Sequence, residues 1–164
     1  MPRWRSPWTK CRPSGAGAEP VIDVVVVDTN VVVAGLITSD QASPVARVLD
    51  GMLAARWPFA LSEPLIAEYD RVLHRPALTR LHGLPSAAIE SLLTDLAQLA
   101  IMLQPARGPD APDPGDQMLW DMLACRADLR LVTGDRALLA APDIAGRVIS
   151  PAGFMMIRGS GNLP

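Results

Sequence analysis

Five short apolar runs along the chain are predicted to be β-strands. The first, residues 23–27, holds four consecutive valines, and an unbroken β-branched run is typical of a strand buried on both faces of a parallel sheet. The other runs are residues 58–61, 101–105, 129–133 and 147–150.

Segments with helical spacing of apolar residues separate these runs. They are residues 43–57, 62–76, 85–99, 116–126 and 136–140. Ser43 followed by Pro44 suits a helix start, Ser62 suits the N-cap of the next helix, and Pro76 is expected to end that helix. Strands alternating with helices predict an α/β domain with a mainly parallel sheet.

The pattern also sets the expected domain limits. Residues 21–158 are predicted to form one domain, which is consistent with a total length of 164 residues. Residues 1–20 are rich in Arg, Trp, Pro and Gly, and they are predicted to be a disordered leader or an over-extended translation start. Residues 159–164 are expected to be a flexible tail.

Composition indicates a packed protein without a membrane segment. The mean hydropathy is +0.21, yet the longest apolar stretch, residues 24–37, is interrupted by polar residues and is too short to cross a bilayer. The first twenty residues lack the apolar core of a secretory signal. Cys11 and Cys125 are too few for a disulfide framework and lack metal-pair spacing. A reduced, cytoplasmic protein is therefore expected.

The charged residues are unusual in kind rather than in net charge. The net charge is −2, and the cations comprise fourteen arginines and one lysine, Lys10, which lies in the leader. A GC-rich genome explains such a bias, although arginine is also a planar, permanently charged group that suits phosphate. The composition excludes mechanisms that require a lysine in the folded domain.

Acidic residues follow the predicted strands at the edge where parallel sheets bind ligands. Asp28 follows the first strand, Asp113 and Asp116 precede a helix, and Asp135 follows the strand at 129–133. Glu68 lies one to two turns into the helix after the second strand. Taken singly, Asp116 and Asp135 can be helix caps and Glu68 can be a solvated residue. Asp28 is harder to explain in that way, because it directly follows four valines.

Together, these acids predict a metal site. Carboxylates that meet at one sheet edge repel each other and raise each other's pKa, and no lysine is available to compensate. Mg²⁺ and Mn²⁺ prefer oxygen ligands and can activate a water for attack on a phosphodiester. Asn30 and Thr133 are then expected to hydrogen-bond the acidic ligands and orient them.

Four segments in this order resemble the PIN-domain nucleases, and in particular the bacterial VapC-like toxins of toxin–antitoxin systems. They are VVVVDTNVVVAGL, LSEPLIAEYDRVLHRP, DPGDQMLWDMLA and LRLVTGDRALL, and the resemblance covers residues 23–152. It implies a PIN-like three-layer fold, with a mainly parallel five-stranded sheet flanked by helices. The implied activity is Mg²⁺- or Mn²⁺-dependent hydrolysis of single-stranded RNA by a metal-activated water.

The resemblance also implies a set of site residues. The acidic site would comprise Asp28, Glu68, Asp116 and Asp135, with Asp113 as an additional metal ligand and Asn30 and Thr133 as supporting residues. Either aspartate of the DPGD segment can be the direct ligand, and Asp116 is favoured because it begins a helix. The implied partners are an RNA substrate, a cognate antitoxin and a second copy in a homodimer.

Four basic residues near the predicted site are candidates for RNA contact. Arg71, His74 and Arg75 share one stretch of the Glu68 helix, and Arg136 follows Asp135. The alternative is a solvated helix face on which Glu68 and Arg71 pair at i,i+3 spacing.

Competing functions are a phosphatase and a silent binding module. A haloacid-dehalogenase-like phosphatase also begins with an Asp after an apolar strand, but it requires an acid where this chain has Asn30, and it requires a lysine in the domain. A phosphoacceptor receiver domain also requires that lysine. A PIN-like module that binds RNA or an antitoxin without cleavage is the non-enzymatic alternative, although no expected acid is missing.

Overall fold

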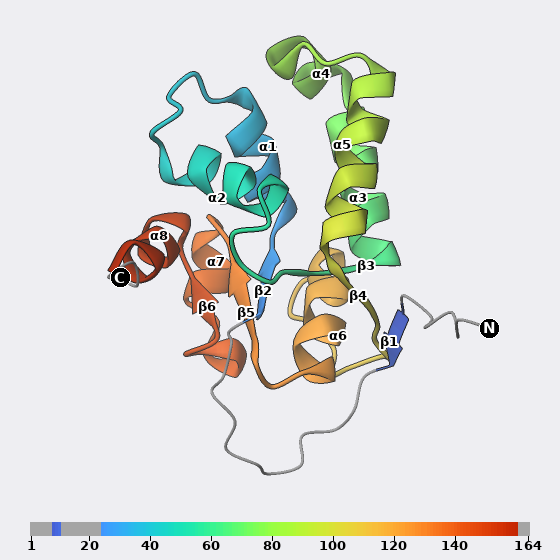
Figure 1. Cartoon of the computed structure of the whole chain (residues 1–164). Coiled ribbons are helices and arrows are strands. Elements are labelled where there is room, and N and C mark those ends of the chain that lie inside the picture. Colours follow the sequence, from blue (N-terminus) through green and yellow to red (C-terminus); the bar gives the residue numbers. More distant parts are fainter. Residues whose placement is uncertain (1–7, 11–23, 161–164) are drawn as a thin grey trace, which may run out of the picture.

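The computed structural model describes residues 8–10 and 24–160 (Figure 1). Its strands are β1 (Trp8–Lys10), β2 (Val24–Val27), β3 (Ala60–Ser62), β4 (Ile101–Gln104), β5 (Leu129–Val132) and β6 (Val148–Ile149). They form two three-stranded sheets, in the orders β1-β4-β3 and β2-β5-β6, and every pair is parallel. All five predicted strands are therefore present.

The two sheets meet at a single bridge between β2 and the start of β3. Val25 pairs with Phe59, and the Val25 N–H donates to the Pro58 carbonyl at 3.2 Å. Pro58 can accept a hydrogen bond but has no N–H to donate, which limits the ladder at this point. The predicted, mainly parallel sheet is thus confirmed, although its strand pairing is divided between two three-stranded ladders that are joined at this bridge.

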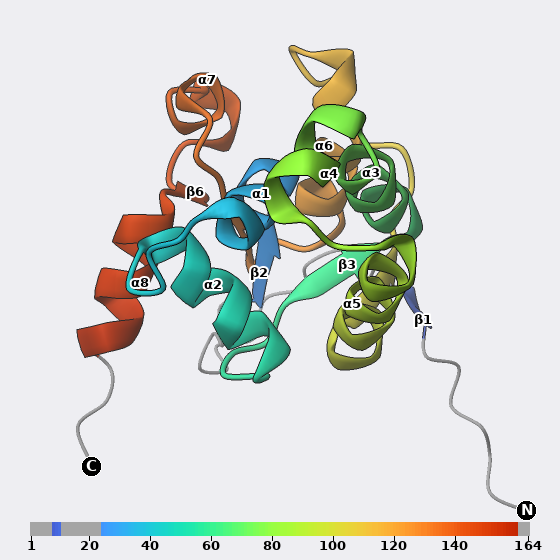
Figure 2. The same ribbon diagram turned by 90° about the horizontal axis from the view of Figure 1, so that it is seen from above.

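Eight α-helices connect and cover the strands in the described part of the chain. They are α1 (Thr29–Ile37), α2 (Pro44–Leu53), α3 (Glu63–Leu73), α4 (Pro76–His82), α5 (Ser86–Leu99), α6 (Gln117–Cys125), α7 (Arg136–Leu139) and α8 (Pro151–Ser160). Two 3-10 turns, η1 (Pro114–Asp116) and η2 (Pro142–Ile144), complete the secondary structure there. Figure 2 shows α6 and α7 on one side of the strands and α2 and α5 on the other, which is a three-layer α/β arrangement.

The predicted helix starts agree with the structure. The Ser43 hydroxyl accepts a hydrogen bond from the Ala46 N–H and the Ser62 hydroxyl accepts one from the Leu65 N–H, each at 3.4 Å. The helix α3 ends at Leu73 rather than at Pro76, because Pro76 begins the separate helix α4. Proline is tolerated in the first turn of a helix, because a backbone N–H there has no partner within the helix and its loss removes no hydrogen bond.

Sequence analysis missed α1, α4 and α8. The helix α1 is the most consequential, since it carries three consecutive valines, which favour strand conformation in isolation. Val31 and Val32 are each only 1 % exposed, so burial against the rest of the core outweighs the local preference. The apolar stretch that follows Asp28 therefore folds back over the sheet as a helix.

Part of the predicted leader belongs to the sheet. β1 pairs with the outer edge of β4, with Trp8 opposite Met102. A strand edge presents unpaired backbone donors and acceptors, and an extended segment can satisfy them regardless of its composition. The expectation of a disordered leader is corrected for Trp8–Lys10. The rest of that prediction, for residues 1–7 and 11–20, lies outside the described residues, as do residues 161–164 of the predicted tail.

Two further expectations bear on the environment of the protein. Among the described residues, none of the helices is both long and apolar enough to cross a membrane. Cys125, the last residue of α6, is disulfide-bonded, so the expectation of reduced cysteines is wrong for this residue.

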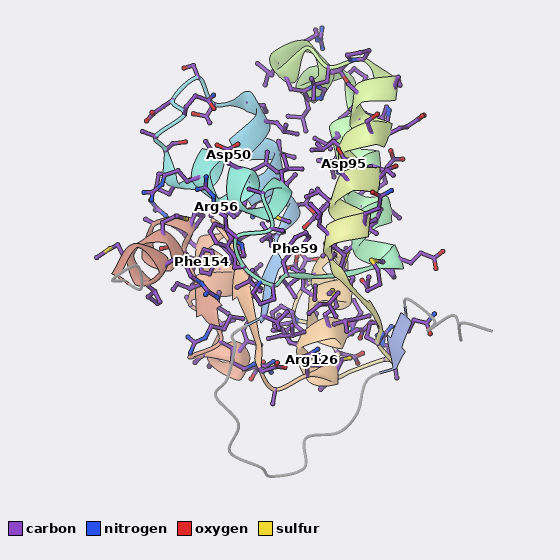
Figure 3. The ribbon with its side chains drawn as sticks, viewed as in Figure 1. Asp50, Arg56, Phe59, Asp95, Arg126 and Phe154 are labelled. Atoms are coloured by element: carbon purple, nitrogen blue, oxygen red, sulfur yellow. The ribbon has the colours of Figure 1, made fainter. Side chains whose placement is uncertain are left out.

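Trp57, which follows α2, packs between that helix and α8. Trp57 is 6 % exposed and meets the ring of Phe154, which is labelled on α8 in Figure 3, edge to face at 5.1 Å between centroids. The Trp57 ring also lies directly over Gly51 of α2, where an added Cβ would come within 1.9 Å of a ring carbon. Glycine at this position lets the indole seat against the helix.

We expect Gly51→Ala to destabilise the protein because the indole must move away from its position against Phe154. Overpacking of this kind costs about 1–3 kcal/mol, which exceeds the gain in helix propensity from alanine. Thermal unfolding followed by circular dichroism measures the loss. The matched control is Gly159→Ala in α8, where a Cβ meets nothing within 4 Å. An unchanged melting temperature for Gly51→Ala would contradict this account of the packing.

Candidate active site

Asp28 occupies the junction between β2 and α1. The residue is buried, with 8 % of its surface exposed. Its Oδ2 accepts hydrogen bonds from the Thr133 hydroxyl at 2.7 Å and from the Asn30 Nδ2 at 2.8 Å. The carboxylate does not cap α1, although Asp28 stands at the N-cap position. Its orientation is therefore set by two side chains from different segments, which is how ligand-holding carboxylates are commonly fixed.

Thr133 and Asn30 connect the ends of β2 and β5. The Asn30 Nδ2 lies 3.3 Å from the Thr133 Oγ1, and the Asn30 Oδ1 accepts from the Gly134 N–H at 3.2 Å. The Thr133 Oγ1 also accepts from the Asp135 N–H at 3.0 Å. These bonds bring the start of α7 next to Asp28. The predicted supporting residues thus contact the acids that they were expected to orient.

Glu68 reaches the same region from α3, in its second turn. The following residue, Tyr69, is fully buried, and its hydroxyl donates a hydrogen bond to the Val27 carbonyl, immediately before Asp28. Burial and the nearby Asp28 carboxylate raise the pKa of Tyr69, so the phenol stays protonated and remains a donor. Tyr69 therefore ties α3 to the end of β2. Sequence analysis missed this residue, although it is the one tyrosine of the chain.

The two aspartates of the DPGD segment have different roles. Asp113 caps η1 by accepting a hydrogen bond from the Gly115 N–H at 2.8 Å. Asp116 stands at the boundary between η1 and α6, and its side chain makes no capping hydrogen bond. The capping interpretation therefore fits Asp113 but not Asp116. It also fits Asp135, whose Oδ1 accepts from the Ala137 N–H at 2.7 Å at the start of α7.

One pocket of about 730 Å³ receives four of the five predicted acids. Asp28, Glu68, Asp116 and Asp135 line it, whereas Asp113 does not. Volumes of roughly 300–1,000 Å³ are typical of ligand sites. The pocket lies beyond the carboxyl ends of β2, β3 and β5, where parallel sheets place their ligands.

The carboxylates of the pocket repel one another. Burial raises the pKa of Asp116 to about 6, and the charges of the other four acids, Asp28, Asp113, Asp135 and Glu68, act in the same direction. Burial also raises the pKa of Asp28, against the opposing effect of the Thr133 hydroxyl. The clustered negative charge is thus a property of the site and not only of the sequence.

The donor chemistry of this pocket fits a hard divalent cation. Every acid in it offers carboxylate oxygens, and a cation would relieve the repulsion that adds to burial in raising the pKa of Asp116. In residues 24–160, however, no three His, Cys, Asp or Glu side chains are already grouped as metal ligands. Mg²⁺ keeps several of its waters in protein sites and needs only one or two direct carboxylates, so the open arrangement is compatible with it.

The sequence comparison agrees with this geometry. The PIN domain family matches residues 24–137, which span β2 to α7 and include every predicted acid. The chain belongs to the PIN domain family. PIN domains are generally nucleases and typically use divalent metals. No curated protein matches the chain.

The basic residues proposed for RNA contact are not equivalent in this PIN domain. Arg71 forms an ion pair with the Glu68 carboxylate, and the His74 ring lies against Asp70, 3.2 Å from its Oδ1. Arg136 is exposed at the start of α7 and does not line the pocket. Arg75 is exposed and does line it. The i,i+3 pairing that sequence analysis raised as an alternative is thus present for Arg71.

We expect Asp116→Asn to stabilise the metal-free PIN domain at neutral pH. The folded-state pKa of Asp116, about 6, lies above its ordinary value of 3.8, so its ionisation in the folded protein costs stability as the pH rises from about 4 to 6. After solvent screening, the gain is about 1 kcal/mol, or about 2–4 °C in melting temperature.

Melting curves in chelator between pH 4 and 8 measure this gain, which should be near zero at pH 4 and complete above pH 7. The matched control is Asp95→Asn, an exposed residue labelled on α5 in Figure 3, which should show no such pH-dependent gain. An Asp116→Asn variant that melts below the wild type at pH 8 would show that the carboxylate stabilises the fold instead.

Proposed function

We propose that this PIN domain is a Mg²⁺- or Mn²⁺-dependent endoribonuclease that hydrolyses single-stranded RNA, and that it acts as the toxin of a toxin–antitoxin pair. The observation that carries the proposal is the pocket lined by Asp28, Glu68, Asp116 and Asp135. Three of these acids, all except Glu68, form no ion pair in the described part of the chain. Their charge is therefore available to an external cation.

Asp28, Glu68, Asp116 and Asp135 would hold the metal. When bound, it would activate a water and neutralise charge on a phosphodiester undergoing attack. The chain's own residues orient this chemistry. Thr133 and Asn30 hold the Asp28 carboxylate, and Tyr69 fixes α3, and with it Glu68, against the end of β2.

Two features of the site support a nucleic acid as the proposed substrate. A phosphatase of the haloacid-dehalogenase kind needs an acid at position 30, where this chain has Asn30, whose side-chain amide donates a hydrogen bond to Asp28. An arginine beside the acids suits the phosphates of a nucleic acid strand. The toxin role rests on the resemblance to VapC-like proteins. A small DNA-binding protein encoded by the neighbouring gene would support it.

The proposal predicts RNA cleavage that depends on Asp28. Purified protein should cleave single-stranded RNA with Mn²⁺ or Mg²⁺ and not in chelator. Losing a residue that merely orients a ligand costs about 10–100-fold, so Asp28→Asn should reduce the rate by at least about 100-fold. Gel analysis of a labelled oligoribonucleotide measures this, with Asp95→Asn as the unaffected control.

Each other outcome has a distinct meaning. RNA binding without cleavage under every metal condition would indicate the silent binding module instead. Hydrolysis of small phosphomonoesters would indicate a phosphatase. Cleavage by Asp28→Asn at the wild-type rate would exclude Asp28 from the reaction and point to a contaminating nuclease.

The ion pair between Arg71 and Glu68 predicts competition with the metal. Both Arg71 and a bound cation need the Glu68 carboxylate, so Arg71→Ala should tighten Mn²⁺ binding. Exposed pairs are worth about 0.2–1 kcal/mol, which corresponds to a gain of up to about fivefold in affinity. Calorimetric titration with MnCl₂ measures it, with Arg80→Ala on α4 as the control. Weaker Mn²⁺ binding by Arg71→Ala would mean that the pair organises Glu68 for the metal.

A further inference from the structure

The pocket extends well beyond its acids as a trough between two helices. Its walls are Val33, Ala34 and Ile37 from α1 and Leu65, Val72 and Arg75 from α3 and the residues after it. Within each wall the residues recur at intervals of one, three, four or seven, so each helix presents mainly one face to the trough. The helices α1 and α3 also pack against each other. The trough is therefore built mainly by two helices, with Arg75 in the turn that follows α3.

The polarity of the residues that line the trough changes along its length. Asn30 and Glu68 line the end nearest the acids, and Ile37 and Arg75 lie seven residues further along their respective segments. Asn30 and Ile37 both lie in α1, so at a helical rise of 1.5 Å per residue they are about 10 Å apart along the trough. A ligand that fits must therefore be polar at one end, apolar in the middle and negatively charged at the other end.

Arg75 is suited to hold that negative charge. It is the one basic residue among the described residues that line the pocket, and it forms no ion pair with a described carboxylate. Arg71, four residues earlier, is occupied with Glu68. An exposed guanidinium without a carboxylate partner is a ready donor to a phosphate group.

We propose that this trough binds one unpaired nucleotide beside the phosphodiester at the acids, with its base against the apolar walls and its other phosphate on Arg75. The inference rests on the proposed nuclease function, and it adds where one nucleotide of the strand is held relative to the cleaved phosphodiester. Bases in an A-form duplex stay stacked and paired, so a base can enter the trough only from a single-stranded or extruded nucleotide.

The composition of the walls also indicates how the base is held. Valine, alanine, isoleucine and leucine line the trough, and none of the described lining residues is aromatic. Affinity for the base therefore comes from burial of its apolar surface rather than from stacking between rings. The trough should accept each of the four bases with modest differences in affinity.

The experiment measures RNA binding separately from cleavage. A fluorescein-labelled single-stranded decaribonucleotide is titrated with the full chain in chelator, and binding is followed by anisotropy at several salt concentrations. Arg75→Ala should weaken binding about three- to tenfold and lower the salt slope by about 0.7, as expected for the loss of one phosphate contact to a single strand. Arg80→Ala, on the next helix and outside the pocket, is the matched control.

A second arm tests the base. Ile37→Ser in the wall should weaken binding of the intact oligonucleotide, whereas Leu81→Ser, at a residue that is 63 % exposed on α4, should not. The same oligonucleotide with an abasic site placed at each position in turn should bind the wild type less well at one register. At that register, Ile37→Ser should cause no further loss, because the base it contacts is already absent.

The outcomes separate this inference from the nuclease proposal. If Arg75→Ala binds like Arg80→Ala and no abasic position matters to the wild type, the nucleotide site is wrong, even if metal-dependent cleavage is observed. If both effects appear but no metal supports cleavage, the nucleotide site stands and the nuclease proposal fails. Equal affinity for a fully paired duplex of the same sequence would also overturn the inference.

Discussion

The hydrogen bond between the Thr133 hydroxyl and the buried Asp28 carboxylate connects the strands to the chemistry of this protein. A carboxylate that is 8 % exposed is costly unless its oxygens are hydrogen-bonded, and here one oxygen accepts from both Thr133 and Asn30. Thr133 lies just after β5 and Asp28 just after β2, so the bond depends on the parallel register of those two strands. The register of the sheet is therefore a condition for the geometry of the site.

Much of the fold could be predicted from local pattern. The five apolar runs became strands because their β-branched and aliphatic residues are buried in a parallel arrangement, and the serines before α2 and α3 cap those helices as expected. The helix α1 could not be predicted in this way. Its valines favour a strand locally, and only the packing of Val31 and Val32 in the assembled core makes the helix favourable.

The candidate site was likewise predictable from the sequence only in part. Position after a strand was enough to indicate Asp28 and Asp135, because parallel strands end at a common edge. Spacing alone could not choose between Asp113 and Asp116, since that choice depends on which carboxylate the turn η1 uses as its cap. Sequence spacing also could not show that Arg71 pairs with Glu68 while Arg75 lines the pocket. That difference depends on the direction of the side chains around the end of α3.

The bridge between the two sheets has a consequence for the site. Glu68 follows β3, whereas Asp28 and Asp135 follow strands of the other sheet, and among the described residues only the bridge at Val25 joins the two ladders directly. The spacing between Glu68 and the other acids is therefore set by packing between α3 and β2 as well as by strand pairing. The hydrogen bond from the Tyr69 hydroxyl to the Val27 carbonyl is one such contact, so losing it would change the position of Glu68 relative to Asp28.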